Sequence, residues 1–196
     1  MRICFVGDSF VNGVGDPSYL GWTGRVCLDA DQYQDEITYY NLGVRRETSA
    51  DILQRCFGEV SCRLSPEYDS RVVFSFGVND TTLEQGKTRV QVSDSLQNTR
   101  KMLTDAASTY PVLMIGPPPI ADFEQNQRID HLSQQIQSIC EEINIPYLNI
   151  FNSLIFSQVW IDEVKNYDGA HPRSEGYIIL ANLVKNWSAW QNWLNE

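Results

Sequence analysis

Histidine is scarce in this chain of 196 residues, and basic residues are outnumbered by acidic ones. The sequence holds two histidines, and 25 acidic residues stand against 15 basic ones, which gives a formal net charge of -10. A field of this sign repels phosphate backbones and anionic lipid surfaces, so we do not expect nucleic acid as a partner. No window holds the run of about 20 apolar residues that a membrane helix needs, and we therefore expect no membrane span.

Closely paired cysteines are also missing, and so is a long apolar run before the first predicted strand. The five cysteines are odd in number and widely spread, and only Cys56 and Cys62 could be forced into a metal-binding pair. We therefore expect buried free thiols, no metal site and no cofactor. Only residues 1–6 precede the first turn, and they read as a strand, so we expect no signal peptide and a cytoplasmic location.

The sequence does contain a regular alternation of two kinds of segment. Short apolar runs rich in β-branched and aromatic residues predict strands at 3–6, 37–42, 72–76, 112–115 and 147–150. Segments with helical spacing lie between and after them, at 20–29, 49–64, 89–107, 126–143 and 174–194. This order predicts one α/β domain over residues 1–196. It should be a doubly wound, flavodoxin-like, three-layer α/β/α fold with a mostly parallel five-stranded sheet.

Three of the predicted strands end in polar, turn-forming or small residues. These are Gly7-Asp8-Ser9 after the first strand, residues 43–49 after the second, and Gly77-Val78-Asn79-Asp80 after the third. Parallel strands bring their carboxyl ends to one edge of a sheet, and ligands of such sheets bind at that edge. We therefore expect the functional site there.

A serine, a histidine and an acid in this pattern suggest nucleophilic chemistry. A serine hydroxyl is a poor nucleophile until a neutral imidazole takes its proton, and a carboxylate fixes the tautomer of that imidazole. His171 follows Asp168 by three residues, an offset that can bring the carboxylate to Nδ1 on one turn. Taken singly, His171 is better read as a surface residue capping the next helix, and Ser9 as a turn or capping serine.

Together, the three blocks resemble the SGNH/GDSL hydrolases. Gly7-Asp8-Ser9-Phe10 resembles their nucleophile block, residues 77–80 match the G-x-N-D block, and residues 168–171 match the closing D-x-x-H block, in the family's order. The resemblance covers nearly the whole chain. It implies a serine esterase acting on a small-molecule ester, with Ser9 as nucleophile, His171 as general base and then acid, and Asp168 orienting His171.

The same resemblance implies an oxyanion hole, and one block departs from it. The side chain of Asn79 and the backbone N–H of Ser9 would bind the oxyanion. Where the family usually has a glycine before an acidic residue and threonine, this chain has Arg46. The N–H of Arg46 can still act as the third donor, although a positive φ would be strained there, and Gly43 is the alternative.

The charge of Arg46 has two readings. At the mouth of the site it would favour esters that carry a carboxylate, phosphate or sulfate. Alternatively, it pairs with a nearby acid such as Glu47 or Asp80 and only holds the loop.

Two other classes of function stay open at this point. A metal-dependent phosphoesterase would also place carboxylates and amides after strands, but such sites usually recruit several histidines, and this chain adds only His131 on a predicted helix. A non-catalytic binding module on the same fold would have lost its chemistry at Arg46. A compact chain without an evident lid insertion favours short acyl groups. The sequence leaves the oligomeric state open.

Overall fold

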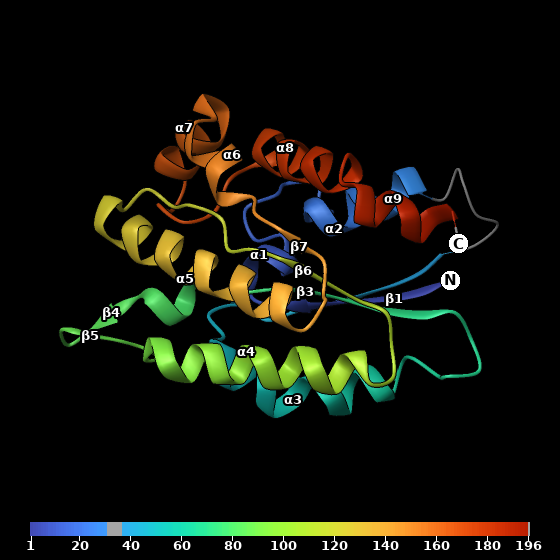
Figure 1. The fold of residues 1–196 in the computed structure, drawn as a ribbon. Helices are drawn as coiled ribbons and strands as arrows, with labels where there is room; N and C mark the ends of the chain where they lie inside the picture. Colours follow the sequence, from blue (N-terminus) through green and yellow to red (C-terminus); the bar gives the residue numbers. More distant parts are fainter. Residues whose placement is uncertain (31–36, 196) are drawn as a thin grey trace.

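A five-stranded parallel sheet forms the centre of the computed structural model, which describes residues 1–30 and 37–195 (Figure 1). Its strands follow the order β2-β1-β3-β6-β7, and each pairing between neighbours is parallel. The bounds are β1 (Arg2–Gly7), β2 (Thr38–Gly43), β3 (Ser70–Ser75), β6 (Val112–Ile115) and β7 (Tyr147–Leu148). This is the flavodoxin-like order of a doubly wound sheet, and the predicted fold class is confirmed.

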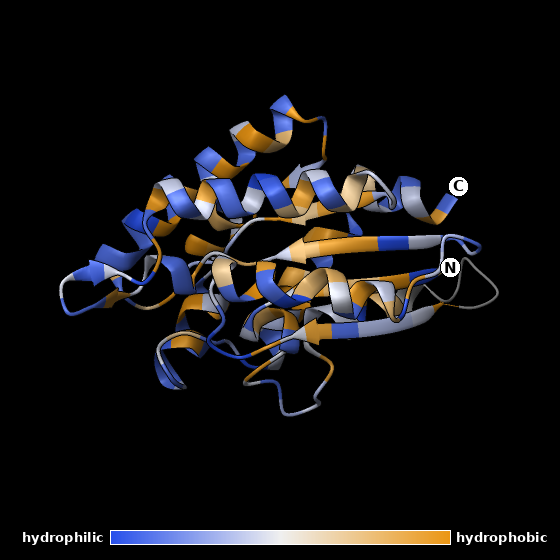
Figure 2. Cartoon of the chain, turned by 90° about the horizontal axis from the view of Figure 1, so that it is seen from below, coloured by the Kyte–Doolittle hydropathy of each residue, from blue (hydrophilic) through white to orange (hydrophobic). Residues whose placement is uncertain are grey.

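Both faces of the three inner strands of the sheet are buried. Successive side chains of a strand point to opposite faces, and in β1 Ile3 and Phe5 enter the core on one face while Cys4 and Val6 enter the core on the other. Figure 2 accordingly shows most of the inner strands in the hydrophobic colour, while a strand at the edge of the sheet is mostly pale or blue. Strands covered on both sides must be apolar on both sides, which is why they appear in the sequence as short continuous apolar runs.

Helices cover the two faces in two layers (Figure 1). Side chains of α3 (Ser49–Ser61), α4 (Val92–Ala107) and most of α5 (Phe123–Glu142) pack into the core that contains Cys4 and Val6. The other core is closed by α2 (Gly21–Ala30), α6 (Phe151–Ile155), α7 (Gln158–Asn166), α8 (Ser174–Lys185) and α9 (Ser188–Asn195). Within the described ranges, none of these helices is both long and apolar enough to cross a membrane.

The predicted helix 174–194 is two helices. Asn186 ends α8, and its side-chain Nδ2 donates to the carbonyl of Asn182 at 2.9 Å, the kind of local bond that competes with helix continuation. The separate α9 then buries Trp190 and Trp193 in the core, where Trp190 packs against Phe5.

The predicted helix 89–107 starts later than expected, because a small hairpin precedes it. Strands β4 (Leu83–Glu84) and β5 (Lys87–Thr88) pair antiparallel, and α4 begins at Val92. The turn between the strands places Gln85 and Gly86 at positive φ, as two-residue hairpin turns require. Strands of two residues leave no periodic signal, so the sequence pattern did not reveal this hairpin.

The cysteine prediction is correct for four of the five residues. All five thiols are free, and Cys4, Cys27, Cys56 and Cys140 are buried. Cys62 is exposed, which contradicts the prediction. It is the C-cap residue of α3, beyond the apolar face with which that helix packs on the sheet.

Candidate active site

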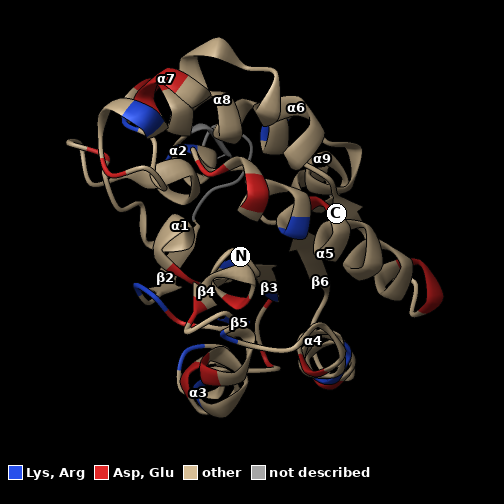
Figure 3. Cartoon of the chain, turned by 90° about the vertical axis from the view of Figure 1, so that its left-hand side faces the viewer, with Lys and Arg blue, Asp and Glu red and all other residues tan. Residues whose placement is uncertain are grey.

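The carboxyl ends of β1, β2 and β3 lie at one edge of the sheet, the edge that Figure 3 faces. They bring together the polar segments that the sequence analysis found after the first three predicted strands, residues 7–9, 43–49 and 77–80. Gly7, the last residue of β1, is in register with Gly43 of β2 and with Ser75 of β3. The segments that follow these strands are therefore neighbours in space, as the sequence predicted.

Ser9 begins a short helix, α1 (Ser9–Asn12), directly after β1. Asp8 is the N-cap of α1, and its Oδ1 accepts a hydrogen bond from the N–H of Phe10 at 3.0 Å. The strand before it is tightly packed, since a Cβ added at Gly7 would lie 1.9 Å from the carbonyl oxygen of Ser75. Ser9 itself is buried, and burial raises the pKa of Asp8 to about 7.

His171 joins Ser9 to Asp168 by two hydrogen bonds. Its Nε2 lies 2.7 Å from Ser9 Oγ, and its Nδ1 lies 2.7 Å from Asp168 Oδ2. With the carboxylate ionised, Nδ1–H donates to Asp168 and leaves Nε2 to accept the Ser9 hydroxyl proton. Because His171 is buried, the alternative reading of a surface capping histidine does not hold.

The surroundings favour the neutral form of the His171 imidazole and the ionised form of the Asp168 carboxylate. Burial lowers the pKa of His171, and this outweighs the opposite effect of its bond to Asp168. Burial also raises the pKa of Asp168, but hydrogen bonds from the backbone N–H and ring of His171 and from the N–H of Ala170 outweigh it, so that pKa is lowered. The pair is thus set up to accept a proton from Ser9.

Neighbouring elements hold the loop that carries Asp168 and His171. The carbonyl of Gly169 accepts the N–H of Ala121 at 2.9 Å, which ties this loop to the proline-rich segment after β6. Beyond His171, Glu163 of α7 caps α8 from outside: its Oε2 accepts the N–H groups of Arg173 at 2.8 Å and Gly176 at 2.7 Å. Sequence reasoning missed Glu163, because nothing in its local sequence links it to a helix ten residues later.

Arg45 is a second residue that sequence reasoning missed. Its Nη2 lies 3.6 Å from Asp168 Oδ2, and its side chain is 60% exposed. The positive charge also lowers the pKa of His171, to a smaller extent than burial does. The only signal was its position next to Arg46 in the block that departs from the family pattern.

Asn79 lies on the other side of Ser9, at the start of the 3-10 helix η1 (Asn79–Thr81). Its Nδ2 donates to the carbonyl of Glu47 at 2.9 Å and faces Asp8 Oδ2 at a longer 3.4 Å. Its neighbour Asp80 is buried and structural, because its carboxylate accepts the N–H of Ser49 at 2.7 Å and the hydroxyl of Ser95. Of the G-x-N-D block, the amide of Asn79 therefore faces the site.

Arg46 adopts the positive φ that the sequence analysis named as strained, at 69°. It is the third residue of a turn closed by a 3.4 Å bond from the N–H of Glu47 to the carbonyl of Val44. Within residues 1–30 and 37–195, the N–H groups of Ser9 and Arg46 have no hydrogen-bond partner. Both are therefore available to an incoming group.

The Arg46 side chain does not pair with either acid that the sequence suggested. Its Nη2 instead lies 3.7 Å from Oε1 of Glu84 in the hairpin. Of the two expected acids, Glu47 pairs with Arg55 at 2.6 Å and Asp80 is buried. In Figure 3, acidic and basic segments accordingly lie side by side between β2 and the hairpin. Gly43 is excluded as the alternative donor, since its N–H donates to Asn41 Oδ1 at 2.9 Å.

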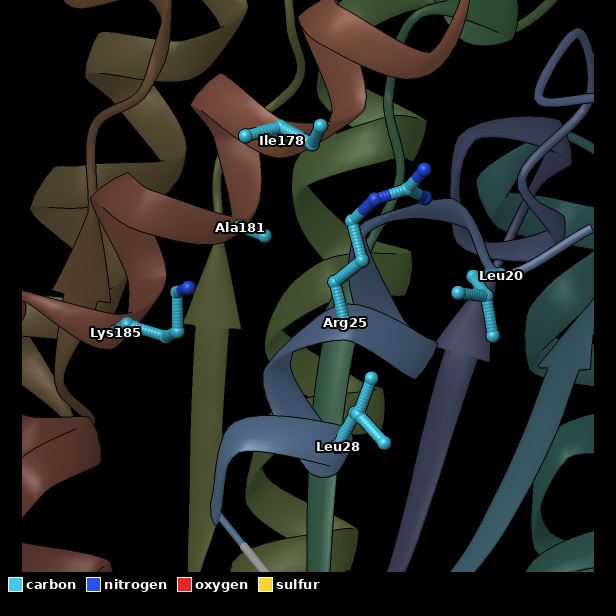
Figure 4. Close-up of a pocket in the computed structure, with 6 residues that line it drawn as sticks. All are labelled: Leu20, Arg25, Leu28, Ile178, Ala181 and Lys185. Atoms are coloured by element: carbon cyan, nitrogen blue, oxygen red, sulfur yellow. The ribbon is translucent and has the colours of Figure 1, made fainter. Parts of the chain in front are cut away.

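A pocket of about 250 Å³ lies away from these residues, between α2 and α8 (Figure 4). It is lined by Leu20, Arg25, Leu28, Ile178, Ala181 and Lys185. The Arg25 guanidinium on its wall is bound to the buried carboxylate of Asp16, which offsets its charge. None of the lining residues belongs to the three sequence blocks.

Metal-ligating side chains are not clustered in the part of the chain that the structure describes. No group of three or more His, Cys, Asp and Glu side chains within it is arranged to hold an ion. His131, the other histidine, lies exposed on α5 and takes no part in the hydrogen bonds that join Ser9, His171 and Asp168.

Comparison with known proteins places the chain among hydrolases. Residues 5–179 match the GDSL-like lipase/acylhydrolase family. The crystal structure of a lipase/acylhydrolase from Enterococcus faecalis superposes with a TM-score of 0.77 at 27% identity, covering 94% of this chain and 93% of that one. A catalytic mutant of Axe2, an acetylxylan esterase from Geobacillus stearothermophilus, gives a TM-score of 0.72 at 16% identity, covering 93% and 91%.

A curated relative is matched over part of its length. The uncharacterized protein YpmR from Bacillus subtilis (strain 168) is 22% identical over 164 residues, which are 83% of this chain and 56% of that protein. The chain thus spans little more than half of that relative. Since the family match covers most of the chain, from β1 into α8, the protein belongs to the GDSL-like lipase/acylhydrolase family.

Proposed function

We propose that this hydrolase is a serine esterase that cleaves short-chain acyl esters through an acyl-enzyme on Ser9. The observation that supports this most strongly is the continuous chain of hydrogen bonds from Ser9 Oγ through His171 to Asp168, with 2.7 Å at both steps. A hydroxyl, a neutral imidazole and an ionised carboxylate in this order are the components of nucleophilic acyl transfer.

In the first half of the proposed reaction, Ser9 Oγ bonds to the acyl carbon while His171 Nε2 takes the hydroxyl proton. The carbonyl π electrons move onto the oxygen and form an oxyanion. When they return, the bond to the alcohol oxygen breaks, and His171 gives its proton to the leaving alcohol. Asp168 stabilises the imidazolium that exists between these two transfers.

In the second half, water repeats the sequence on the acyl-enzyme. His171 takes a proton from the water, whose oxygen bonds to the acyl carbon. Collapse of the second oxyanion breaks the bond to Ser9 Oγ, which recovers the proton from His171, and the carboxylic acid leaves. The free enzyme is restored without any cofactor.

Three donors are available for the oxyanion in this proposal. The N–H groups of Ser9 and Arg46 are without partners within the described ranges. The Asn79 amide is held by its 2.9 Å bond to Glu47, and the hydrogen in the longer 3.4 Å contact to Asp8 is the one that turns to the substrate. Preorganised donors of this kind act mainly on the transition state, where charge develops on the oxygen.

The proposed substrate class is a small, uncharged acyl ester. The segments that join β1 to α1 and β2 to α3 at the site edge are short. Neither is long enough to enclose a long acyl chain. The exposed Arg46 charge is offset by Glu84, and this favours neutral over anionic esters. We further propose that residues 1–196 act as one domain, because both cores run the length of the sheet.

The test is hydrolysis of p-nitrophenyl acetate, butyrate and decanoate, with and without EDTA. We expect turnover of the two shorter esters and no effect of EDTA. Ser9→Ala should lower kcat by about 10⁴-fold or more, because a missing triad nucleophile leaves only binding and the oxyanion donors. The control is Ser138→Ala, an exposed serine on α5, which should match the wild type.

Each alternative outcome points to a different function. Loss of activity in EDTA would point to a metal-dependent phosphoesterase or esterase. Turnover that survives in Ser9→Ala would exclude the acyl-enzyme. No turnover by folded wild-type protein, on any of the three esters, would favour a non-catalytic binding module.

A further inference from the structure

Arg46 stands at a turn position that usually requires glycine. A turn whose third residue has positive φ strains any residue with a Cβ, and arginine has no short side chain that could bond locally and relieve it. Arg46 nonetheless has a φ of 69°. A strained backbone conformation persists only where the surrounding residues hold it. The contacts of Arg46 therefore decide whether its backbone N–H keeps one fixed orientation.

The β4–β5 hairpin supplies those contacts through Arg89. Its Nη1 donates to the Arg46 carbonyl at 2.8 Å, and its Nε lies 3.4 Å from Glu84 Oε1. The same Glu84 oxygen lies 3.7 Å from Arg46 Nη2. The backbone and side chain of Arg46 are thus both held by one pair of residues, Glu84 within the hairpin and Arg89 directly after it.

Arg89 is itself anchored to the segment that carries Asn79. Its own N–H donates to the carbonyl of Thr82 at 2.9 Å, and the N–H of Val90 donates to the carbonyl of Asp80 at 3.2 Å. Its side chain is only 18% exposed, which limits its freedom to move. On the other side, Asn79 donates to Glu47, the residue after Arg46. The carbonyls of Arg46 and Glu47 are therefore both fixed by side-chain hydrogen bonds, from Arg89 and Asn79 respectively.

We infer that Arg89 is a positioning residue of the oxyanion hole, which holds the Arg46 peptide in its left-handed conformation so that its N–H faces the reacting carbonyl. The inference rests on the proposed esterase function. It explains how a non-glycine residue can serve at a turn position whose positive φ favours glycine. It also gives the hairpin a role, although no sequence block includes it.

The test separates this role from a general structural one by changing Arg46 and Arg89 together. Arg89→Ala should lower kcat for p-nitrophenyl acetate by about 10-fold to 100-fold with little change in KM, because the donor acts mainly in the transition state. In an Arg46→Gly background the turn needs no support, and the same Arg89→Ala change should then have little effect on kcat.

Two further variants serve as controls. Arg89→Lys keeps the charge but lacks the fork that reaches both Arg46 and Glu84, and an intermediate kcat is expected. It also replaces Arg89→Ala if that variant fails to fold. Arg100→Ala removes an exposed arginine that pairs with Glu142 and should leave kcat unchanged.

Equal losses of kcat on Arg89→Ala in the wild-type and Arg46→Gly backgrounds, or no loss in either, would overturn the role of Arg89 while leaving the esterase function intact. No hydrolysis by the wild type and no labelling of Ser9 by a fluorophosphonate would overturn the esterase function, and this inference with it.

Discussion

Burial and two charges of opposite sign act on the imidazole of His171, and together they set the pH range in which it can accept a proton. Burial lowers the pKa of His171 most strongly, Asp168 raises it, and Arg45 lowers it again. Only the neutral imidazole acts as a base, so the acidic limb of kcat/KM follows this pKa. The site should therefore stay active below the pH at which an ordinary histidine becomes protonated.

Arg45→Gln should move that acidic limb to higher pH. Removing the guanidinium takes away a positive charge that disfavours the imidazolium, and it also leaves Asp168 free to stabilise the imidazolium more strongly, so both effects raise the pKa of His171. The measurement is kcat/KM for p-nitrophenyl acetate from about pH 4.5 to about pH 9, a range that brackets an ordinary histidine pKa. Arg100→Gln, which alters a remote exposed pair, is the matched control.

Added salt should shrink the difference between Arg45→Gln and the wild type, because the Arg45 side chain is 60% exposed and ions screen it. An acidic limb that stays in place, or one that moves to lower pH, would show that Arg45 does not act on the imidazole.

At the residue scale, motif order predicted which side chains meet, and it did not predict which neighbours tune them. Ser9, Asp168 and His171 come together as the sequence suggested, through two contacts of 2.7 Å. Arg45 and Glu163 act through contacts with residues far along the chain, which leave no periodic or motif signal. Arg46 adopts the positive φ that was recognised as a strain, but its partner Glu84 lies in an element too short to predict.

At the element scale, α8 depends on α7 for its start. Arg173, the N-cap residue of α8, provides no side-chain capping bond. The N–H groups of Glu175 and Gly176 in the first turn bond to the Glu163 carboxylate instead. His171 lies two residues before this cap. The helix start therefore helps to fix the imidazole as well as the helix itself.

Glu163→Ala should lower the free energy of unfolding by about 1–2 kcal/mol, the usual effect of losing a helix cap with charge-assisted bonds. It should also lower kcat/KM, since the loop before α8 loses its anchor. Urea unfolding and ester hydrolysis measure the two effects. Glu67→Ala removes the same charge from an exposed loop and should change neither. A stable variant with normal kcat/KM would mean that α8 does not need this cap.

Helices and strands differed in how far the sequence predicted them. The strand runs were recognisable because both faces of the inner strands are buried, as β3 shows with every residue buried. The break after Asn186 was missed because apolar spacing continues across it into α9. α1, α6, α7 and the hairpin are short or irregular, and such elements show too little periodicity to identify.

At the scale of the whole molecule, the fold was predictable and the substrate was not. The alternation of strands and helices leaves few right-handed topologies, and the observed sheet order is one of them. Side chains at the sheet edge come from segments far apart in the sequence, such as 45–46, 84–89 and 168–171. Their mutual contacts exist only in the folded chain.

Covalent labelling with a fluorophosphonate tests whether Ser9 is the nucleophile. We expect one label per folded chain by intact mass, located on Ser9 by peptide mapping. The label should be absent in Ser9→Ala and form much more slowly in His171→Ala, which lacks the base. Ser138→Ala should label like the wild type. A label on another residue, or no label on folded wild-type protein, would show that Ser9 is not the nucleophile.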